Sequence, residues 1–151
     1  MRWPERTRSV RSLRFSILLV FVFGCLAGPG CSSTSARKII PLDRFQRIYV
    51  ERRLNENNRL DEIMAAELRR LGRDASSGPL TMMPENTDAI LTYDARWAWD
   101  FKTYLIELNV ELHAVRPHKK LADGRYYQPS IKTKPPAEAA RAILEPLFAK
   151  P

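Results

Sequence analysis

The segment YLIELNVELHAV, residues 104–115, decides the fold, because apolar and polar side chains alternate along it. The alternation predicts a strand with a period of two residues. Its apolar face would carry Tyr104, Ile106, Leu108, Val110, Leu112 and Ala114. Its polar face would carry Glu107, Asn109, Glu111 and His113. A strand with one wet face is typical of an antiparallel sheet that covers a core on one side only.

The flanking segments extend this pattern into a sheet. Residues 89–97, AILTYDARW, alternate in the same way, and residues 45–51, FQRIYVE, are rich in β-branched and aromatic side chains. Residues 116–119, RPHK, predict a turn, and residues 121–128 predict the strand that returns from it. Gly124 within that strand would allow a bulge or the close approach of another element.

Two segments have helical spacing. One apolar stripe consists of Leu60, Ile63, Met64, Leu68 and Leu71. Asn57 or Asn58 would cap this helix at its start, and Gly72 would stop it. The second stripe consists of Ala140, Ile143, Leu144 and Leu147. Pro135 and Pro136 suit the entry to this helix, and Pro146 should distort or end it near its last turn.

The predicted order is therefore β-α-β-β-β-α, which indicates an α+β fold. The economical arrangement is a two-layer sandwich with a mixed, mostly antiparallel sheet and both helices on one face. Residues 39–151 would form this single domain. Residues 25–38 are rich in glycine, serine and proline and predict a flexible tether.

Residues 1–24 have the order of a secretory signal peptide. Five arginines precede the uncharged run FSILLVFVFG, residues 15–24, which is short for a membrane span of about 20 residues. An uncleaved anchor helix is the alternative. Removal of residues 1–24 takes away those five arginines and one glutamate, so 20 basic and 16 acidic residues remain and the formal charge falls from +8 to +4. That weaker charge and an envelope location both argue against nucleic acid as a partner.

The stretch VFGC, residues 22–25, resembles the lipobox of bacterial lipoproteins. The resemblance implies lipidation at Cys25, with Cys31 as the alternative site because Ser32 and Ser33 follow it. A disulfide between the two cysteines is a third, weaker option. Neither Leu26 nor Ser32 is the aspartate that retains enteric lipoproteins at the inner membrane, so the resemblance implies an outer-membrane anchor that faces the periplasm. Several acyl chains such as palmitate would hold the chain on the membrane durably.

Candidate catalytic and metal-binding residues give little support to an enzyme. Glu107 and Glu111 would lie about 13 Å apart on one strand face, whereas glycosidase carboxylates lie about 5–9.5 Å apart. Asp94 and Asp100 could converge only through a bend. His113 and His118 supply two ligands, and a closed zinc site needs four. We therefore expect no catalytic residue, no metal and no cofactor.

Two surface groups are candidates for binding. Trp97 should pack in the core, whereas for Trp99 and Phe101 core packing and partner contact are equally supported. A basic turn follows, formed by Arg116, His118, Lys119, Lys120 and Arg125. The residues expected to contact a partner are Trp99, Phe101, Arg116, Lys119 and Lys120.

Several segments together resemble a group of small bacterial envelope proteins with the α/β domain of the TolB N-terminus and CsgG. The segments are RIYV (47–50), ELRRLG (67–72), DAILTYDARW (88–97) and YLIELNVELHA (104–114). Related hairpins often carry a Thr-Gly turn, in place of which this chain has RPHK. The resemblance implies a non-enzymatic accessory role, with an envelope protein or peptidoglycan-associated machinery as partner. The alternatives are a carrier of a small ligand or lipid and, last, an envelope hydrolase.

Overall fold

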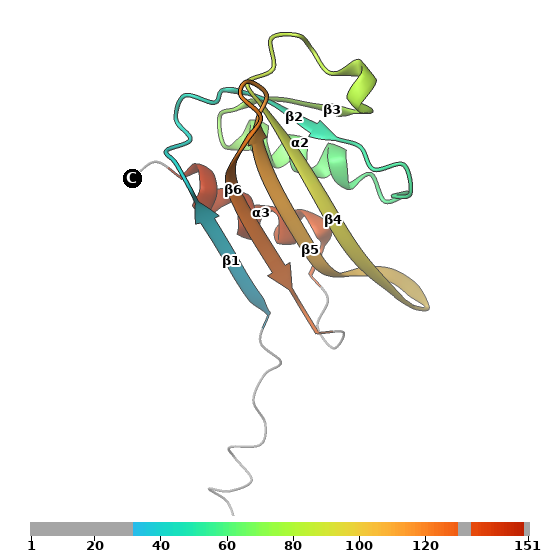
Figure 1. Cartoon of the computed structure of the whole chain (residues 1–151). Helices are drawn as coiled ribbons and strands as arrows, with labels where there is room; N and C mark the ends of the chain where they lie inside the picture. The colour runs from blue at the N-terminus through green and yellow to red at the C-terminus, as the bar shows by residue number, and fades with distance from the viewer. Residues whose placement is uncertain (1–31, 130–133, 150–151) are drawn as a thin grey trace, which may run out of the picture. The chain divides into compact units, whose positions relative to one another are not determined.

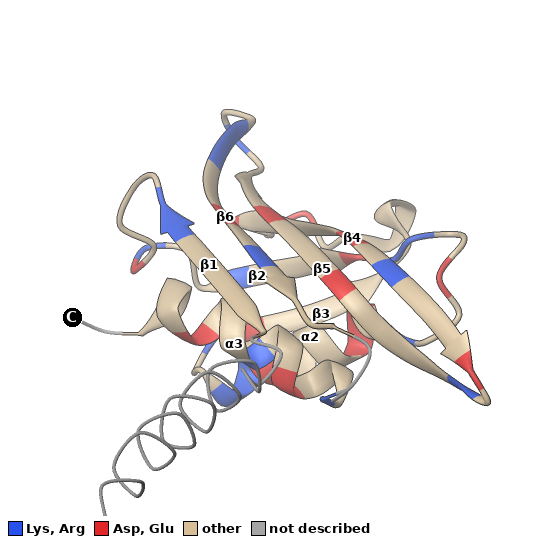
Figure 2. Ribbon diagram, turned by 90° about the horizontal axis from the view of Figure 1, so that it is seen from below, with Lys and Arg blue, Asp and Glu red and all other residues tan. Residues whose placement is uncertain are grey.

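The computed structural model describes residues 32–129 and 134–149, in which two helices cover one face of a six-stranded sheet (Figures 1 and 2). The elements are β1 (Ser33–Lys38), β2 (Arg47–Glu51), α2 (Leu60–Arg70), β3 (Asp74–Gly78), the 3-10 helix η1 (Leu80–Met82), β4 (Ala89–Asp100), β5 (Lys102–Ala114), β6 (Lys119–Tyr127) and α3 (Pro136–Phe148). This arrangement confirms the predicted α+β class.

The sheet has the order β1-β6-β5-β4-β2-β3. The pairs β1/β6, β6/β5 and β5/β4 are antiparallel, whereas β2 runs parallel to both β4 and β3. The parallel pair β2/β3 is joined through α2, which crosses back over the sheet. The sheet is therefore mixed and mostly antiparallel, as predicted.

The folded part begins earlier than residue 39. Residues 33–38, assigned above to the tether, form the edge strand β1, which pairs with β6 from Ser33↔Tyr127 to Lys38↔Ala122. The segment STSARK is polar on both faces, so its sequence carries no apolar alternation. β3 also has no counterpart among the predicted strands, because DASSG has no strand pattern. Both strands lie at edges of the sheet, where only one neighbour is needed.

A bulge changes which side chains of β5 face the core. Arg96 pairs with Glu107, but the next residue, Trp97, pairs with Leu105. One extra residue in β5 therefore reverses the alternation. Leu105 is fully buried, whereas Tyr104 and Ile106 are only half-buried. The assignment of Tyr104 and Ile106 to the face of Leu108 is therefore wrong.

α2 forms where its apolar stripe predicts it, but its start is held differently. Arg59, in the left-handed conformation, precedes the helix, and neither Asn57 nor Asn58 caps it. The Glu56 carboxylate instead accepts hydrogen bonds from the backbone N–H groups of Asn58 and Leu60, at 2.6 and 3.0 Å. Gly72 ends the turn with a φ of 80°, as predicted.

α3 packs closely on the sheet and against α2. A Cβ added to Gly124 in β6 would lie 2.2 Å from Cγ2 of Ile143, so glycine permits this contact. The two helices are joined by Glu67, whose carboxylate accepts hydrogen bonds from Arg141 at 3.0 and 3.1 Å and from Arg70 at 2.8 Å. α3 ends two residues after Pro146. Leu60, Met64, Leu68, Ile143 and Leu144 fill the space between helices and sheet.

Candidate functional site

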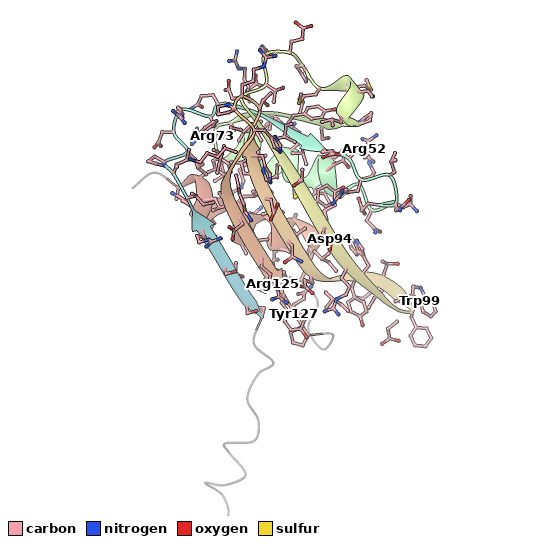
Figure 3. All side chains as sticks on the ribbon, viewed as in Figure 1. Arg52, Arg73, Asp94, Trp99, Arg125 and Tyr127 are labelled. Carbon is pink, nitrogen blue, oxygen red and sulfur yellow. The ribbon has the colours of Figure 1, made fainter. Side chains whose placement is uncertain are left out.

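The hairpin of β4 and β5 ends in an exposed aromatic turn, residues 99–101, called the hairpin tip below. Trp99 is 74% exposed and Phe101 is 93% exposed. Their ring centroids lie 6.2 Å apart, and Phe101 turns the chain with a φ of 57°. Figure 3 shows Trp99 at the far end of the long hairpin. Trp97, two residues earlier, packs against the core as predicted.

The N-terminal end of β1 lies at the same end of the sheet as the hairpin tip (Figure 1). Ser33 pairs with Tyr127, Tyr127 with Glu107, and Glu107 with Arg96. This row of paired residues crosses β4 four residues before Asp100. At about 3.4 Å per residue, the tip therefore extends about 14 Å beyond the row that contains Ser33.

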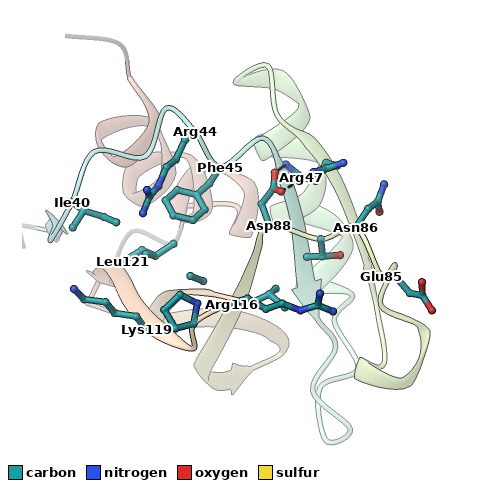
Figure 4. A pocket seen from close by; sticks show the side chains of 14 residues that line it. Ile40, Arg44, Phe45, Arg47, Glu85, Asn86, Asp88, Arg116, Lys119 and Leu121 are labelled. Atoms are coloured by element: carbon teal, nitrogen blue, oxygen red, sulfur yellow. Dashed lines mark hydrogen bonds and ion pairs between the residues drawn. The ribbon is translucent and has the colours of Figure 1, made fainter.

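The basic turn between β5 and β6 lies at the opposite end of the sheet from the tip. The two predicted contact groups therefore lie apart, with Trp99 and Phe101 at one end of the sheet and Arg116 and Lys119 at the other. Arg116 and Lys119 line a cavity of about 590 Å³ (Figure 4). Arg44 also lines it, and sequence reasoning missed this residue because it is distant along the chain.

Lys120 and Arg125 do not belong to this cavity. Lys120 forms ion pairs with Glu111 at 2.7 Å and Asp123 at 3.5 Å. Arg125 pairs with Glu107 at 2.8 Å. The expected basic group is thus divided: two of its cations are neutralised on the open face of the sheet.

Figure 2 shows basic and acidic positions along β4, β5 and β6, and ion pairs join several of them. Glu107 also pairs with Arg96 at 3.2 Å, and Glu111 contacts His113 at 3.1 Å. The hydrogen bond from Lys120 is the main cause that lowers the pKa of Glu111. Glu107 therefore lies between Arg96 and Arg125, and Glu111 lies between Lys120 and His113.

Of the remaining candidate catalytic and metal residues, the two aspartates lie apart and the two histidines lie together. Asp94 and Asp100 lie six residues apart on the continuous strand β4, about 20 Å along it, so the bend that would join them is absent. His113 and His118 stack with ring centroids 5.1 Å apart. Within residues 32–129 and 134–149, no three histidine, cysteine, aspartate or glutamate side chains gather as a metal site would require.

The lipidation candidates Cys25 and Cys31 lie outside the described residues. Neither α2 nor α3, nor any other helix in the described ranges, combines the length and apolar character needed to cross a membrane.

Comparison with known proteins finds the same fold in solved bacterial structures. No family model matches the chain, and no curated protein does. Two PelC dodecamer structures from Paraburkholderia phytofirmans align with TM-scores of 0.61 and 0.62, at 16% and 15% identity. Each alignment covers 80% of this chain and 100% of the PelC chain. A minor lipoprotein from Acinetobacter baumannii aligns at 15% identity over 69% of this chain and 85% of its own, with a TM-score of 0.29. The PelC alignments establish a shared fold, while the likeness to TolB and CsgG stays a prediction.

Proposed function

We propose that this chain is a lipid-anchored accessory protein of the bacterial outer membrane. It faces the periplasm, acts by binding and not by catalysis, and uses the hairpin tip as a second contact with the membrane. One observation carries the proposal: the exposed aromatic tip lies at the end of the sheet from which the chain leads back to Cys25 and Cys31.

The length of chain between the cysteines and Ser33 supports this contact. Cys31 precedes Ser33 by two residues, which span at most about 7 Å, and Cys25 precedes it by eight, which span about 28 Å. The tip extends about 14 Å beyond the Ser33 row. An anchor at Cys31 would therefore place the tip inside the bilayer, and an anchor at Cys25 would allow it to reach the surface.

The chemistry of the tip suits a membrane interface. Tryptophan is enriched where membrane meets water, and apolar side chains there enter about 5–10 Å into the boundary. Transfer of Trp99 and Phe101 from water would stabilise the contact by about 1.5 kcal/mol or more each, before the loss of side-chain freedom. The tip would thus orient a protein that the acyl chains alone would leave free to rotate.

The PelC structures that share this fold are dodecamers, so the fold is one that can act by assembly with other chains. The filled core gives no support to a carrier with a pocket between sheet and helices. The separated carboxylates give none to a hydrolase.

The anchor is tested by labelling cells that produce the full chain with radioactive palmitate. We expect incorporation into the chain, and loss of the label in Cys25→Ser or, if the alternative site is used, in Cys31→Ser. A chain that stays unlabelled in both forms and is recovered at full length from the cytosol contradicts the proposal.

The tip is tested with the lipidated protein in vesicles of brominated phosphatidylcholine, which quenches nearby tryptophan. We expect strong quenching that falls in Trp99→Phe, because Trp97 is packed against the core. Met82→Ala is the matched control, since Met82 is 72% exposed on η1, away from the tip. Equal quenching of Trp99→Phe and the unchanged protein would contradict a membrane-seated tip.

A further inference from the structure

The cavity of about 590 Å³ lies at the end of the sheet opposite the tip. Three segments line it: residues 40–47, the loop 85–88 and the β5–β6 turn. Its volume lies within the range of about 300–1,000 Å³ that is typical of ligand pockets. We infer that this cavity binds an acidic peptide segment that carries an apolar side chain next to its carboxylates.

Three cations supply the charge for such a ligand. Arg44, Arg116 and Lys119 form no ion pair with any carboxylate in the described part of the chain. Figure 4 shows Arg44 on one side of the cavity and Arg116 and Lys119 on the other. Arginine can hold a carboxylate through two parallel hydrogen bonds. The arrangement therefore allows two carboxylates to be held from opposite sides.

The acidic residues that line the cavity do not cancel this charge. Asp88 already accepts hydrogen bonds from Arg47 at 2.9 Å and from the backbone N–H groups of Gln46 and Arg47 at 3.0 and 2.9 Å. The Arg47 side chain is the main cause that lowers the pKa of Asp88. Glu85 lies at the edge of the cavity in Figure 4, away from Arg44 and Lys119. A net positive charge is left facing the opening.

The floor of the cavity is apolar and limits the class of anion. Phe45 and Leu121 lie between the cations in Figure 4 and are almost fully covered by their neighbours. The accessible apolar surface of the floor comes from Ile40 and Pro117, which are more exposed. An inorganic phosphate or a sugar covered in hydroxyl groups would leave the floor without an apolar partner. A peptide with an aromatic or aliphatic side chain between acidic residues can contact the apolar floor and pair with the three cations.

The Arg44 side chain connects the charged part of the site with its apolar floor. Its guanidinium carbon lies 4.9 Å from the centroid of the Phe45 ring. This cation–π contact places a charged group directly beside the apolar floor. A ligand carboxylate and the side chain next to it would therefore meet Arg44 and the floor together.

The proposal is tested by fluorescence anisotropy with the purified full-length chain in detergent and a labelled peptide, Gly-Glu-Phe-Glu-Glu-Gly. We expect saturable binding that weakens at least tenfold in Lys119→Glu and in Arg116→Glu. Lys102→Glu is the matched control, because it makes the same charge change at the other end of the sheet. Equal losses in Lys119→Glu and Lys102→Glu would mean that net charge alone attracts the peptide, which overturns the site.

Two further sets of measurements identify the class of ligand and test whether weaker binding reflects misfolding. A peptide with glutamine in place of glutamate, or glycine in place of phenylalanine, should bind at least tenfold more weakly. Tighter binding of octyl phosphate or of a uronate oligosaccharide than of the acidic peptide would overturn the peptide assignment. Arg44→Gln removes the charge but keeps a polar side chain, and it should weaken binding while thermal unfolding stays cooperative. Since no membrane is present, failure here leaves the proposed membrane contact untouched.

Discussion

The two ends of one sheet differ in chemistry although the same strands, β4 and β5, reach both. At one end the strands close in an exposed pair of aromatic rings. At the other, their neighbours frame a cavity with cations and an apolar floor. The helices pack on the middle of the sheet, while Trp99 and Phe101 at one end and Arg116 and Lys119 at the other lie outside the hydrophobic core. A small two-layer domain can therefore present two unrelated surfaces about 40 Å apart.

The largest effect is expected from a change that affects both ends of the sheet at once, because it disturbs the packing of α3 on β6. Gly124→Val should place its side chain against Ile143 and force α3 away from β6. We expect a loss of about 2–3 kcal/mol in the free energy of unfolding, measured by urea denaturation.

Membrane contact and peptide binding should then be lost together, at a lower urea concentration than in the unchanged protein, whereas variants of the tip or of the cavity affect one end each. A Gly124→Val protein with unchanged stability would show that α3 adapts its position at this contact.

Acidification should weaken the contact of α2 with α3 through Glu67, and it should affect both ends of the sheet equally. Hydrogen bonds from Arg141 and Arg70 lower the pKa of Glu67 below its ordinary value of 4.5. The carboxylate therefore stabilises the fold above that ordinary value, and the stabilisation is lost as the pH falls through the lowered value.

Glu67→Gln should remove about 1 kcal/mol at pH 7, since the arginines are partly exposed and water screens them. It should also flatten the fall in stability below pH 4.5 seen in chemical denaturation. An acid profile unchanged in Glu67→Gln would assign that fall to other carboxylates.

A change in salt concentration should give the smallest effect, but it should change peptide binding at the cavity and leave membrane contact at the tip unchanged. Raising sodium chloride from about 0.05 to 0.5 M shortens the range of electrostatic attraction, so peptide binding at the cavity should weaken about threefold or more. Quenching of Trp99 by brominated lipid should hold steady, because burial of apolar surface does not depend on charge. Parallel titrations of both signals with the same protein test this, and a common salt dependence would argue against two distinct surfaces.

Sequence reasoning predicted the elements whose signal is local and periodic. The stripe from Leu60 to Leu71 located α2, and Gly124 was expected to allow close approach. β1 and β3 were missed because edge strands are defined by the neighbour they pair with, and STSARK and DASSG contain no apolar alternation. The bulge that turns Leu105 toward the core and Tyr104 away from it also depends on the partner strand.

Sequence reasoning named several of the candidate residues, whose role in binding stays a prediction, but it did not give their arrangement in space. Trp99 and Phe101 are exposed and Arg116 and Lys119 line a cavity, yet the two pairs lie at opposite ends of the sheet. Lys119 and Lys120 are adjacent in sequence, yet Lys120 pairs with Glu111 on the open face. Arg44 lines the cavity although it is distant along the chain. Such groupings follow from topology, which composition and spacing do not encode.

The pairing of β1 with β6 determines how the domain resists force. Tension applied at Ser33, along the strand and away from the sheet, would pull β1 parallel to its partner. The six paired positions would then share the load in shear, instead of opening one after another as a zipper does. A pull on the N-terminal segment would thus be resisted along the whole length of the β1/β6 pairing.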